Sequence, residues 1–294
     1  MSQGNPTLVS GSGDRSGRSP MGILMIARIV HLSDLHFGTV RQQLVQPLLH
    51  AIHSLAPRVV VVSGDLTQRA KRSQFAAAAM FLDKIHVPKV TVPGNHDIAL
   101  WNVYRRFVHP LFPYQRLLGG EVEPTYQDKN LLILGINTAR SSVWMGGRIS
   151  YEQMERLESR FNSAPAHVIK AVVMHHPIVP STEALGVPLV GRNRKALAAL
   201  VRAQADLVFA GHVHHGYTVR SRKNPKLPDH SVLVVQAGTA LSSRRRGRAN
   251  SFNVVDIERD AVNVTPYEWI EESGKFTATR SMRFKGRGVW KLVS

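Results

Sequence analysis

The sequence contains no cysteine, and this absence limits the chemistry available to it. Without thiols the chain can form neither a disulfide framework nor a thiolate metal site, so any metal must be held by nitrogen and oxygen. The chain also lacks an apolar run of the ~20 residues that span a bilayer. We therefore expect a cytoplasmic protein, with peripheral attachment to a membrane left open.

The N-terminal residues have little apolar surface, because Ser, Gly, Asn and Pro surround Arg15 and Arg18. This composition predicts a disordered tail over residues 1–24. The apolar stretch 21–30 has no small-residue cleavage site and continues into a polar motif, which argues against a signal peptide. Translation could start at Met1, Met21 or Met25.

Acidic residues are scarce: 20 Asp and Glu stand against 38 Lys and Arg, a formal net charge of +18. The excess is +7 in residues 1–191 and +11 in residues 192–294. A positive field attracts polyanions, so nucleic acid or an anionic membrane is an open partner beside a small phosphoester. Net charge does not choose among them, and no pattern predicts the oligomeric state.

Apolar periodicity predicts an α/β chain of one domain, for which 294 residues and 43% hydrophobic composition suffice. Blocks 27–32 and 59–63 predict buried strands, and leucines at helical spacing over 42–55 predict a helix between them. This alternation continues to residue 210. Strands are then expected without intervening helices at 217–222, 231–237, 251–257 and 261–269. Such an order predicts two layers of sheet with helices outside.

Two segments fall outside this rhythm. Residues 100–127 are rich in aromatics and predict an insertion over one sheet edge, with core packing favoured over base stacking. Residues 273–294 are basic, and we expect a mobile tail there, with contact to an anionic membrane as the alternative. The globular domain is therefore expected over residues 25–272.

Five short polar motifs each follow an apolar block. They are Ser33-Asp34-Leu35-His36, Gly64-Asp65, Gly94-Asn95-His96-Asp97, His175-His176-Pro177 and Gly211-His212-Val213-His214. Loops beyond the carboxyl ends of strands gather in one crevice, where all five motifs can meet. Carboxylates, imidazoles and an amide suit divalent cations such as Mn, Fe or Zn.

Asp65 stands alone after its strand, beside Gly64, and is the natural carboxylate to bridge two neighbouring cations. Two ions need such a shared ligand to offset their repulsion, and a two-metal site favours in-line displacement at phosphorus. Each motif residue taken singly is more often a turn residue or a structural histidine. The ordered combination favours the metal site. By contrast, His50 and His53 have no accompanying carboxylate and are expected on a solvated helix face.

The ordered set D-x-H, G-D, G-N-H-D, H before P and G-H-x-H resembles the calcineurin-like metallophosphoesterase superfamily over residues 27–256. Residues 64–69 and 237–240 further resemble its bacterial cyclic-nucleotide phosphodiesterase-like branch. The resemblance implies a four-layer α-β-β-α sandwich of two mixed sheets flanked by helices. It also implies a hydrolase that cleaves a phosphodiester, such as a cyclic nucleotide or a glycerophosphodiester, by metal-activated hydroxide.

The resemblance further implies residue roles. Each of two metals has four ligands: Asp34, His36, Asp65 and His214 for one, and Asp65, Asn95, His175 and His212 for the other. His96 would be the catalytic histidine, with Asp97 a possible orienter of its ring. His175 is favoured over His176 because it lies two residues before Pro177.

Three questions stay open from the sequence. Arg244 and Arg245 are candidates to bind substrate phosphate, with a solvated loop as the equal alternative. The enzyme could instead be a nuclease, or a nucleotide-lipid pyrophosphatase at a membrane surface. A non-catalytic metal-binding scaffold is the remaining class, and the intact ligand set and His96 speak against it.

Overall fold

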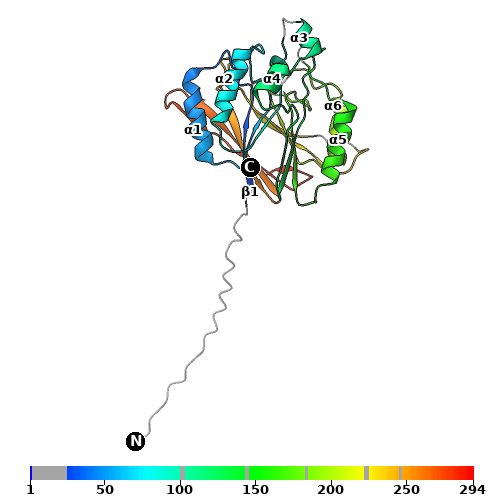
Figure 1. The fold of residues 1–294 in the computed structure, drawn as a ribbon. Helices are drawn as coiled ribbons and strands as arrows, with labels where there is room; N and C mark the ends of the chain where they lie inside the picture. Colours follow the sequence, from blue (N-terminus) through cyan, green and yellow to red (C-terminus); the bar gives the residue numbers. More distant parts are fainter. Residues whose placement is uncertain (2–24, 100–102, 143–145, 183–184, 222–224, 245–246) are drawn as a thin grey trace.

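The computed structural model describes residues 1, 25–99, 103–142, 146–182, 185–221, 225–244 and 247–294 (Figure 1). Apart from Met1, the predicted N-terminal tail up to residue 24 lies outside the described residues. Within the described part, no helix has both the length and the apolar character needed to cross a membrane.

Two β-sheets form the centre of the fold. The strands of the first are β1 (Met25–Leu32), β2 (Val59–Val62), β3 (Lys89–Thr91), β10 (Ser251–Glu258), β11 (Ala261–Ile270), β12 (Lys275–Ala278), β13 (Met282–Lys285) and β14 (Lys291–Leu292). Those of the second are β4 (Thr125–Gln127), β5 (Leu131–Gly135), β6 (Ile169–Val173), β7 (Leu207–Ala210), β8 (Tyr217–Arg220) and β9 (Leu233–Gln236).

Both sheets mix parallel and antiparallel pairs. The first has the order β14-β13-β11-β10-β1-β2-β3, with β12 paired to β11, and the second has the order β4-β5-β6-β7-β9-β8. Strands β1, β2 and β3 are parallel, as are β5, β6, β7 and β9. The expected consecutive strands do form antiparallel pairs, but the chain crosses from one sheet to the other between β9 and β10.

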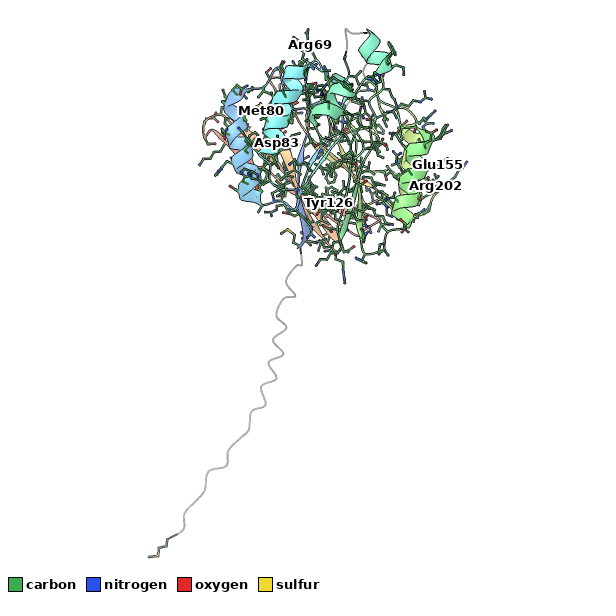
Figure 2. The ribbon with its side chains drawn as sticks, viewed as in Figure 1. Arg69, Met80, Asp83, Tyr126, Glu155 and Arg202 are labelled. Carbon is green, nitrogen blue, oxygen red and sulfur yellow. The ribbon has the colours of Figure 1, made fainter. Side chains whose placement is uncertain are left out.

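Helices cover the outer face of each sheet. They are α1 (Val45–Leu55), α2 (Arg72–Asp83), α4 (Phe112–Leu117), α5 (Tyr151–Asn162) and α6 (Asn193–Arg202), whereas the short helix α3 (Val103–Val108) lies apart from them at the top of Figure 1. Figure 1 shows α1, α2 and α4 on one side of the sheets and α5 and α6 on the other. In Figure 2, Met80 and Asp83 mark α2, and Glu155 and Arg202 mark the opposite helices.

The period-two alternation of the strands accounts for the layers. Val30 and Val60 pack in the core beneath α1 and α2, whereas Ile29 and Val61 face the space between the two sheets. On the far side, Val172 packs in a third core with residues of α5 and α6. The predicted α-β-β-α sandwich of two mixed sheets is therefore confirmed.

The basic segment beyond residue 272 does not form the mobile tail that its composition predicted. Its strands β12 and β13 pair with β11, and β14 pairs with β13. Phe284 and Trp290 are buried between the sheets, at 5% and 1% exposure. Of the apolar side chains that suggested membrane contact, Phe284 and Trp290 are therefore part of the core, whereas Val289 is 41% exposed.

The aromatic insertion packs only in part. Strand β4 pairs with β5 at the edge of the second sheet, and α4 lies against α2. Tyr114 is buried edge-on to Phe75 and donates a hydrogen bond to the Thr91 carbonyl oxygen at 2.8 Å. Phe107 and Phe112, in contrast, are 60% and 53% exposed.

Candidate metal centre

Loops that follow parallel strands of both sheets meet at one end of the sandwich. The Asp34 backbone N–H donates to the Gly64 carbonyl oxygen at 3.1 Å, which joins the loops after β1 and β2. The His175 ring donates from Nδ1 to the Ser63 carbonyl oxygen at 2.7 Å. The His212 N–H donates to Asp34 Oδ2 at 3.0 Å, so the two sheets contribute to one site.

The backbone of this site is strained. Five motif residues have positive φ although none is glycine: Asp34, His36, Asp65, His212 and His214. Such conformations each cost of order 1–3 kcal/mol and persist where the surroundings impose them, commonly at functional sites. Gly64 is required for two reasons. Its φ of +92° favours glycine, and a Cβ on it would lie 2.6 Å from His175 Nδ1.

The Asp34 carboxylate has one satisfied oxygen and one that is not. Ser33 Oγ donates to Oδ2 at 2.6 Å. Oδ1 lies 3.6 Å from Nε2 of both His36 and His214, is buried, and has no hydrogen-bond partner among the described residues. The ligand atoms of these three residues lie within 4.8 Å of one another, a spacing that could hold a cation.

Asp65 repeats this arrangement. Its Oδ1 accepts the His96 backbone N–H at 2.9 Å. Its Oδ2 lies 3.7 Å from His36 Nε2 and 3.4 Å from His175 Nε2, and it too has no partner among the described residues. One carboxylate oxygen therefore faces two groups of candidate ligands.

A second group lies beyond Asp65. Asn95 Oδ1 is 3.2 Å from His175 Nε2 and 3.0 Å from His212 Nδ1. His176 packs against both histidines with ring centroids 4.9 Å away, and its Nδ1 bonds Thr138 Oγ1 at 2.7 Å. Its Nε2 has no described partner, and it belongs to a further group of possible ligands with His175 and His212.

The electrostatics of this pocket favour positive charge. Burial raises the pKa of Asp65, but the neighbouring histidines, with His175 the strongest among them, together outweigh burial and hold that pKa well below its ordinary value. Burial opposes protonation of His175, yet Asp65 raises the pKa of His175 to about 9. His212 is distinct, because burial and the neighbouring His175 lower its pKa to about 3. A buried pair of carboxylates thus demands cationic partners.

His96 is held at the edge of the centre by two groups. Its Nδ1 lies 2.9 Å from the Gln68 carbonyl oxygen, and its Nε2 lies 3.0 Å from Nη1 of Arg244. A carbonyl oxygen only accepts and a guanidinium only donates, so Nδ1 carries the proton and Nε2 accepts. The Arg244 carbonyl oxygen also accepts a hydrogen bond from His214 Nδ1 at 2.7 Å.

The expectation that Asp97 orients the His96 ring is wrong in this geometry, since Gln68 does so. Asp97 instead accepts from the backbone N–H groups of Leu66, Thr67 and Gly94 at 2.8 to 3.1 Å. It is buried and ties the loop after β2 to the loop after β3. The sequence alone does not indicate which of two consecutive polar residues, such as His96 and Asp97, has its side chain in the pocket.

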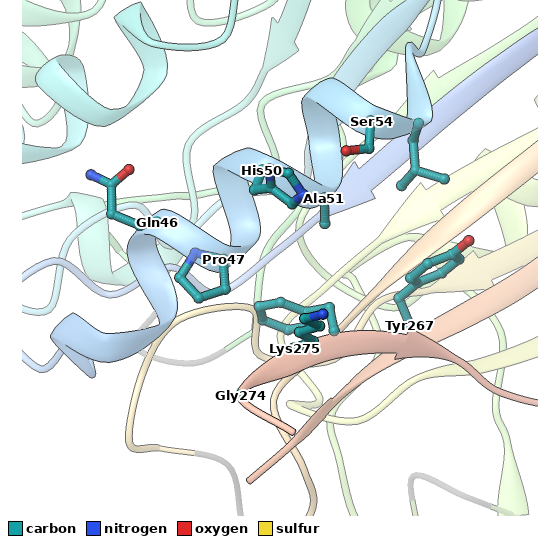
Figure 3. A pocket seen from close by; sticks show the side chains of 10 residues that line it. Gln46, Pro47, His50, Ala51, Ser54, Tyr267, Gly274 and Lys275 are labelled. Carbon is teal, nitrogen blue, oxygen red and sulfur yellow. The ribbon is translucent and has the colours of Figure 1, made fainter. Parts of the chain in front are cut away.

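Of the remaining residues singled out in the sequence, only some lie at the metal centre. Arg244 reaches the site, whereas Arg245 lies outside the described residues. His50 lines a groove of about 690 Å³ between α1 and β12, together with Tyr267 and Lys275 (Figure 3). No predicted metal ligand lines that groove. Sequence reasoning gave no role to Ser33, Ser63 and Gln68. In the structure Ser33 and Ser63 orient the candidate ligands Asp34 and His175, and Gln68 orients His96.

Residues 27–216 match the model of the calcineurin-like phosphoesterase family. The chain therefore belongs to this family, and it is a metallophosphoesterase, a hydrolase acting on phosphoester bonds. The superfamily predicted from the motifs is confirmed.

Relatives with assigned names support the predicted branch. A glycerophosphodiester phosphodiesterase from Enterobacter lignolyticus is 26% identical over 200 residues, covering 64% of this chain and 70% of that protein. A probable cyclic nucleotide phosphodiesterase from Rhodococcus erythropolis is 24% identical, with coverages of 80% and 81%. A cAMP/cGMP dual specificity phosphodiesterase from Mycobacterium tuberculosis is also 24% identical, with coverages of 87% and 85%.

Solved structures share the fold. Purple acid phosphatase from yellow lupin superposes with a TM-score of 0.67 at 14% identity, over 87% of this chain but only 53% of that one. PhoD superposes with a TM-score of 0.66 at 9% identity, over 94% and 73%.

Proposed function

We propose that this chain is a dinuclear-metal phosphodiesterase for a small substrate, of the cyclic nucleotide or glycerophosphodiester kind. The observation that carries the proposal is Oδ2 of Asp65. This buried oxygen has no described hydrogen-bond partner and lies between His36 Nε2 and His175 Nε2 at 3.7 and 3.4 Å. A carboxylate in that position suits a bridge between two cations.

The proposed ligand sets share this bridge. One consists of Asp34, His36, Asp65 and His214, and the other of Asp65, Asn95, His175 and His212. Oxygen and nitrogen donors without sulfur suit Mn, Fe or Zn. The unpartnered buried atoms Asp34 Oδ1, Asp65 Oδ2 and His36 Nε2 fit such cations, because isolated buried polar atoms are otherwise costly. Bound divalent cations would supply Lewis acidity and lower the pKa of a water molecule.

His175 is the proposed ligand in preference to His176. Its Nδ1 donates to the Ser63 carbonyl oxygen, so Nε2, directed toward Asp65, is the nitrogen that a cation could bind in place of a proton. Such a hydrogen bond to the remote nitrogen is the usual way in which a ligating imidazole is oriented. No comparable contact joins His176 to Asp65 among the described residues.

Arg244 and His96 are the proposed groups for the substrate. The guanidinium of Arg244 can form two parallel hydrogen bonds to a phosphoryl oxygen pair. In doing so it would leave His96 Nε2, which could then take up a proton from solvent water and, as imidazolium, donate that proton to the leaving oxygen. Gln68 would hold the ring throughout, through its carbonyl oxygen.

Two alternatives differ from this proposal in substrate or in turnover. Nuclease or nucleotide-lipid pyrophosphatase activity would use the same ligands, and only the net charge favours it. A non-catalytic scaffold would have no use for His96 held beside Arg244. The names of the relatives favour a small diester over both.

Purified protein loaded with Mn²⁺ tests the proposal. We expect release of p-nitrophenol from bis-p-nitrophenyl phosphate, faster than from p-nitrophenyl phosphate, with two ions bound per chain. Preference for the monoester would refute the diesterase assignment. Loaded protein that hydrolyses neither ester nor any cyclic nucleotide would favour the scaffold.

A further inference from the structure

We propose that Arg148, Arg192 and Lys195, gathered around Tyr151, bind a second phosphate group carried by the substrate. The proposal rests on the phosphoesterase function above and deepens it, because it names a class of substrate with more than one phosphate. Backbone contacts at Arg148 and at Gly191 connect this cluster to His176, beside the second group of candidate ligands.

Tyr151 organises the cluster. It is the first residue of α5, and Lys195 Nζ donates to its hydroxyl at 2.7 Å. The Arg192 guanidinium carbon lies 4.2 Å from its ring centroid, and Nη1 donates to the Ile149 carbonyl oxygen at 3.1 Å. Stacking and hydrogen bonding thus hold two cations in place at little further entropic cost.

A short chain of contacts joins the cluster to the metal centre. The Arg148 backbone N–H donates to the Thr138 carbonyl oxygen at 2.8 Å, and Thr138 Oγ1 bonds His176 Nδ1 at 2.7 Å. Gly147 lies so close to His176 that a Cβ there would be 2.2 Å from Nδ1. The Gly191 N–H, next to Arg192, donates to the Gly147 carbonyl oxygen at 2.7 Å.

The cluster carries more positive charge than its neighbours neutralise. In the described part of the chain, no salt bridge involves Arg148, Arg192 or Lys195, although Glu152 stands in the same first turn of α5. Lys195, then Arg192 and Arg148, lower the pKa of Tyr151, so all three lie within electrostatic reach of its hydroxyl. The N-termini of α5 and α6 add partial positive charge.

A purely structural role accounts for only part of this arrangement. Lys195 and Arg192 could join the starts of α5 and α6 through Tyr151. Arg148 has no such partner among the described residues, and placing it there adds repulsion. An anion shared by the three cations removes that repulsion, and phosphate offers several acceptor oxygens to guanidinium and ammonium donors.

Two chromogenic substrates separate this site from the metal centre. The first is thymidine 5′-(p-nitrophenyl phosphate), and the second is the same ester with an added 3′-phosphate. We measure the ratio of kcat/KM between them, and we expect the wild-type protein to prefer the second. In the double variant Arg148→Gln, Lys195→Gln this preference falls by about tenfold, the scale of one charge-assisted contact.

The matched control removes two charges at the opposite end of the sandwich. Lys129 and Arg259 are exposed and lie in the turns between β4 and β5 and between β10 and β11. In Lys129→Gln, Arg259→Gln the ratio should stay at its wild-type value. A ratio that falls equally in both double variants would overturn the site, because it would assign the preference to the net positive charge of the whole protein. A wild-type ratio of one would also overturn the site, because the 3′-phosphate would then contribute nothing.

Binding without turnover distinguishes this inference from the proposed function. Calorimetric titration compares thymidine 3′,5′-bisphosphate, thymidine 5′-monophosphate and inorganic phosphate. If neither ester is hydrolysed but the bisphosphate binds more tightly and Arg148→Gln, Lys195→Gln removes that gain, the phosphate site stands and the proposed function fails. If the bisphosphate gains nothing while free phosphate binds in a manner lost from the variant, the site binds a separate anion and the substrate assignment is wrong.

Discussion

Asp65 and Asp206 are both 1% exposed, yet the side chains around the two carboxylates differ. Asp206 Oδ1 accepts from Arg287 Nε at 2.7 Å, and Oδ2 accepts from Arg287 Nη2 and the Lys170 N–H, each at 2.8 Å. Asp65 Oδ2 has no described partner. A buried carboxylate that stabilises the fold has both oxygens bonded, whereas one that serves a cation keeps an oxygen available.

The side chains that contact Asp206 and Asp65 also connect different parts of the molecule. Arg287 donates to the carbonyl oxygens of Ala166 and Val168 as well, so it joins the C-terminal strands to the second sheet. The histidines around Asp65 contact groups of the site itself: His175 donates to the Ser63 carbonyl oxygen, and His96 donates to that of Gln68. The comparison predicts that changes at Asp65 affect chemistry and that changes at Asp206 affect stability.

The largest effect is expected for Asp65→Ala. Turnover should fall to background and at least one metal should be lost, because both proposed cations share this ligand. Asp206→Asn is the matched control, and it should retain metal content and turnover per folded molecule while unfolding at a lower temperature. Metal analysis, ester hydrolysis and thermal denaturation check both variants. An Asp65→Ala protein with full activity would break the comparison.

His96→Gln should lower turnover by ~10²- to 10⁴-fold, the range expected when a general acid is removed. Both metals should remain, because His96 contacts Asp65 only through its backbone N–H. Metal content and kcat are measured on the same preparation. Loss of a metal would show that His96 is a ligand, and unchanged kcat would remove it from the chemistry.

Arg287→Met tests the structural half of the comparison. It leaves the Asp206 charge buried without its partner, which should cost about 3–5 kcal/mol in the free energy of unfolding. Arg283→Met removes a similar pair with Glu258 at a more exposed position, where the expected cost is about 1 kcal/mol or less. Urea denaturation compares the two. Equal losses in the free energy of unfolding would mean that burial of the Arg287–Asp206 pair does not increase its contribution to stability.

Burial of His31 should lower the stability of the wild-type protein in acid, by less than the loss expected for Arg287→Met. It is fully buried, its Nε2 bonds Ser63 Oγ at 2.9 Å, and burial lowers its pKa from 6.5 to about 3. Below pH 6.5 the unfolded chain takes up a proton that the folded chain does not, so stability falls as pH decreases toward 3. From pH 6.5 to 5 the loss is about 2 kcal/mol.

Denaturation of His31→Asn across this pH range checks the assignment. The variant is less stable at pH 7 but should lose less stability between pH 6.5 and 5 than the wild-type protein. His50→Asn, at an exposed position, should leave the acid dependence unchanged. An identical slope in His31→Asn would assign the acid loss to other groups.

The sequence was sufficient to predict the sandwich and the convergence of the five motifs, because apolar blocks and following polar residues are local signals. It was not sufficient for Asp97, whose hydrogen-bond partners come from three separate positions of two loops. The C-terminal strands were also missed, since Met282 and Phe284 alternate with basic residues for only four positions. The pair between Arg287 and Asp206 has no local signature, as 81 residues separate its members.

The proposed two-metal centre requires Asp65 to bind two cations at once. Electron paramagnetic resonance of the Mn²⁺-loaded protein, with the ions counted per chain, tests it most directly. We expect two ions per chain with the spectrum of a spin-coupled pair, and loss of that spectrum in Asp65→Ala. One ion per chain, or two ions with the spectrum of isolated Mn²⁺, would contradict it.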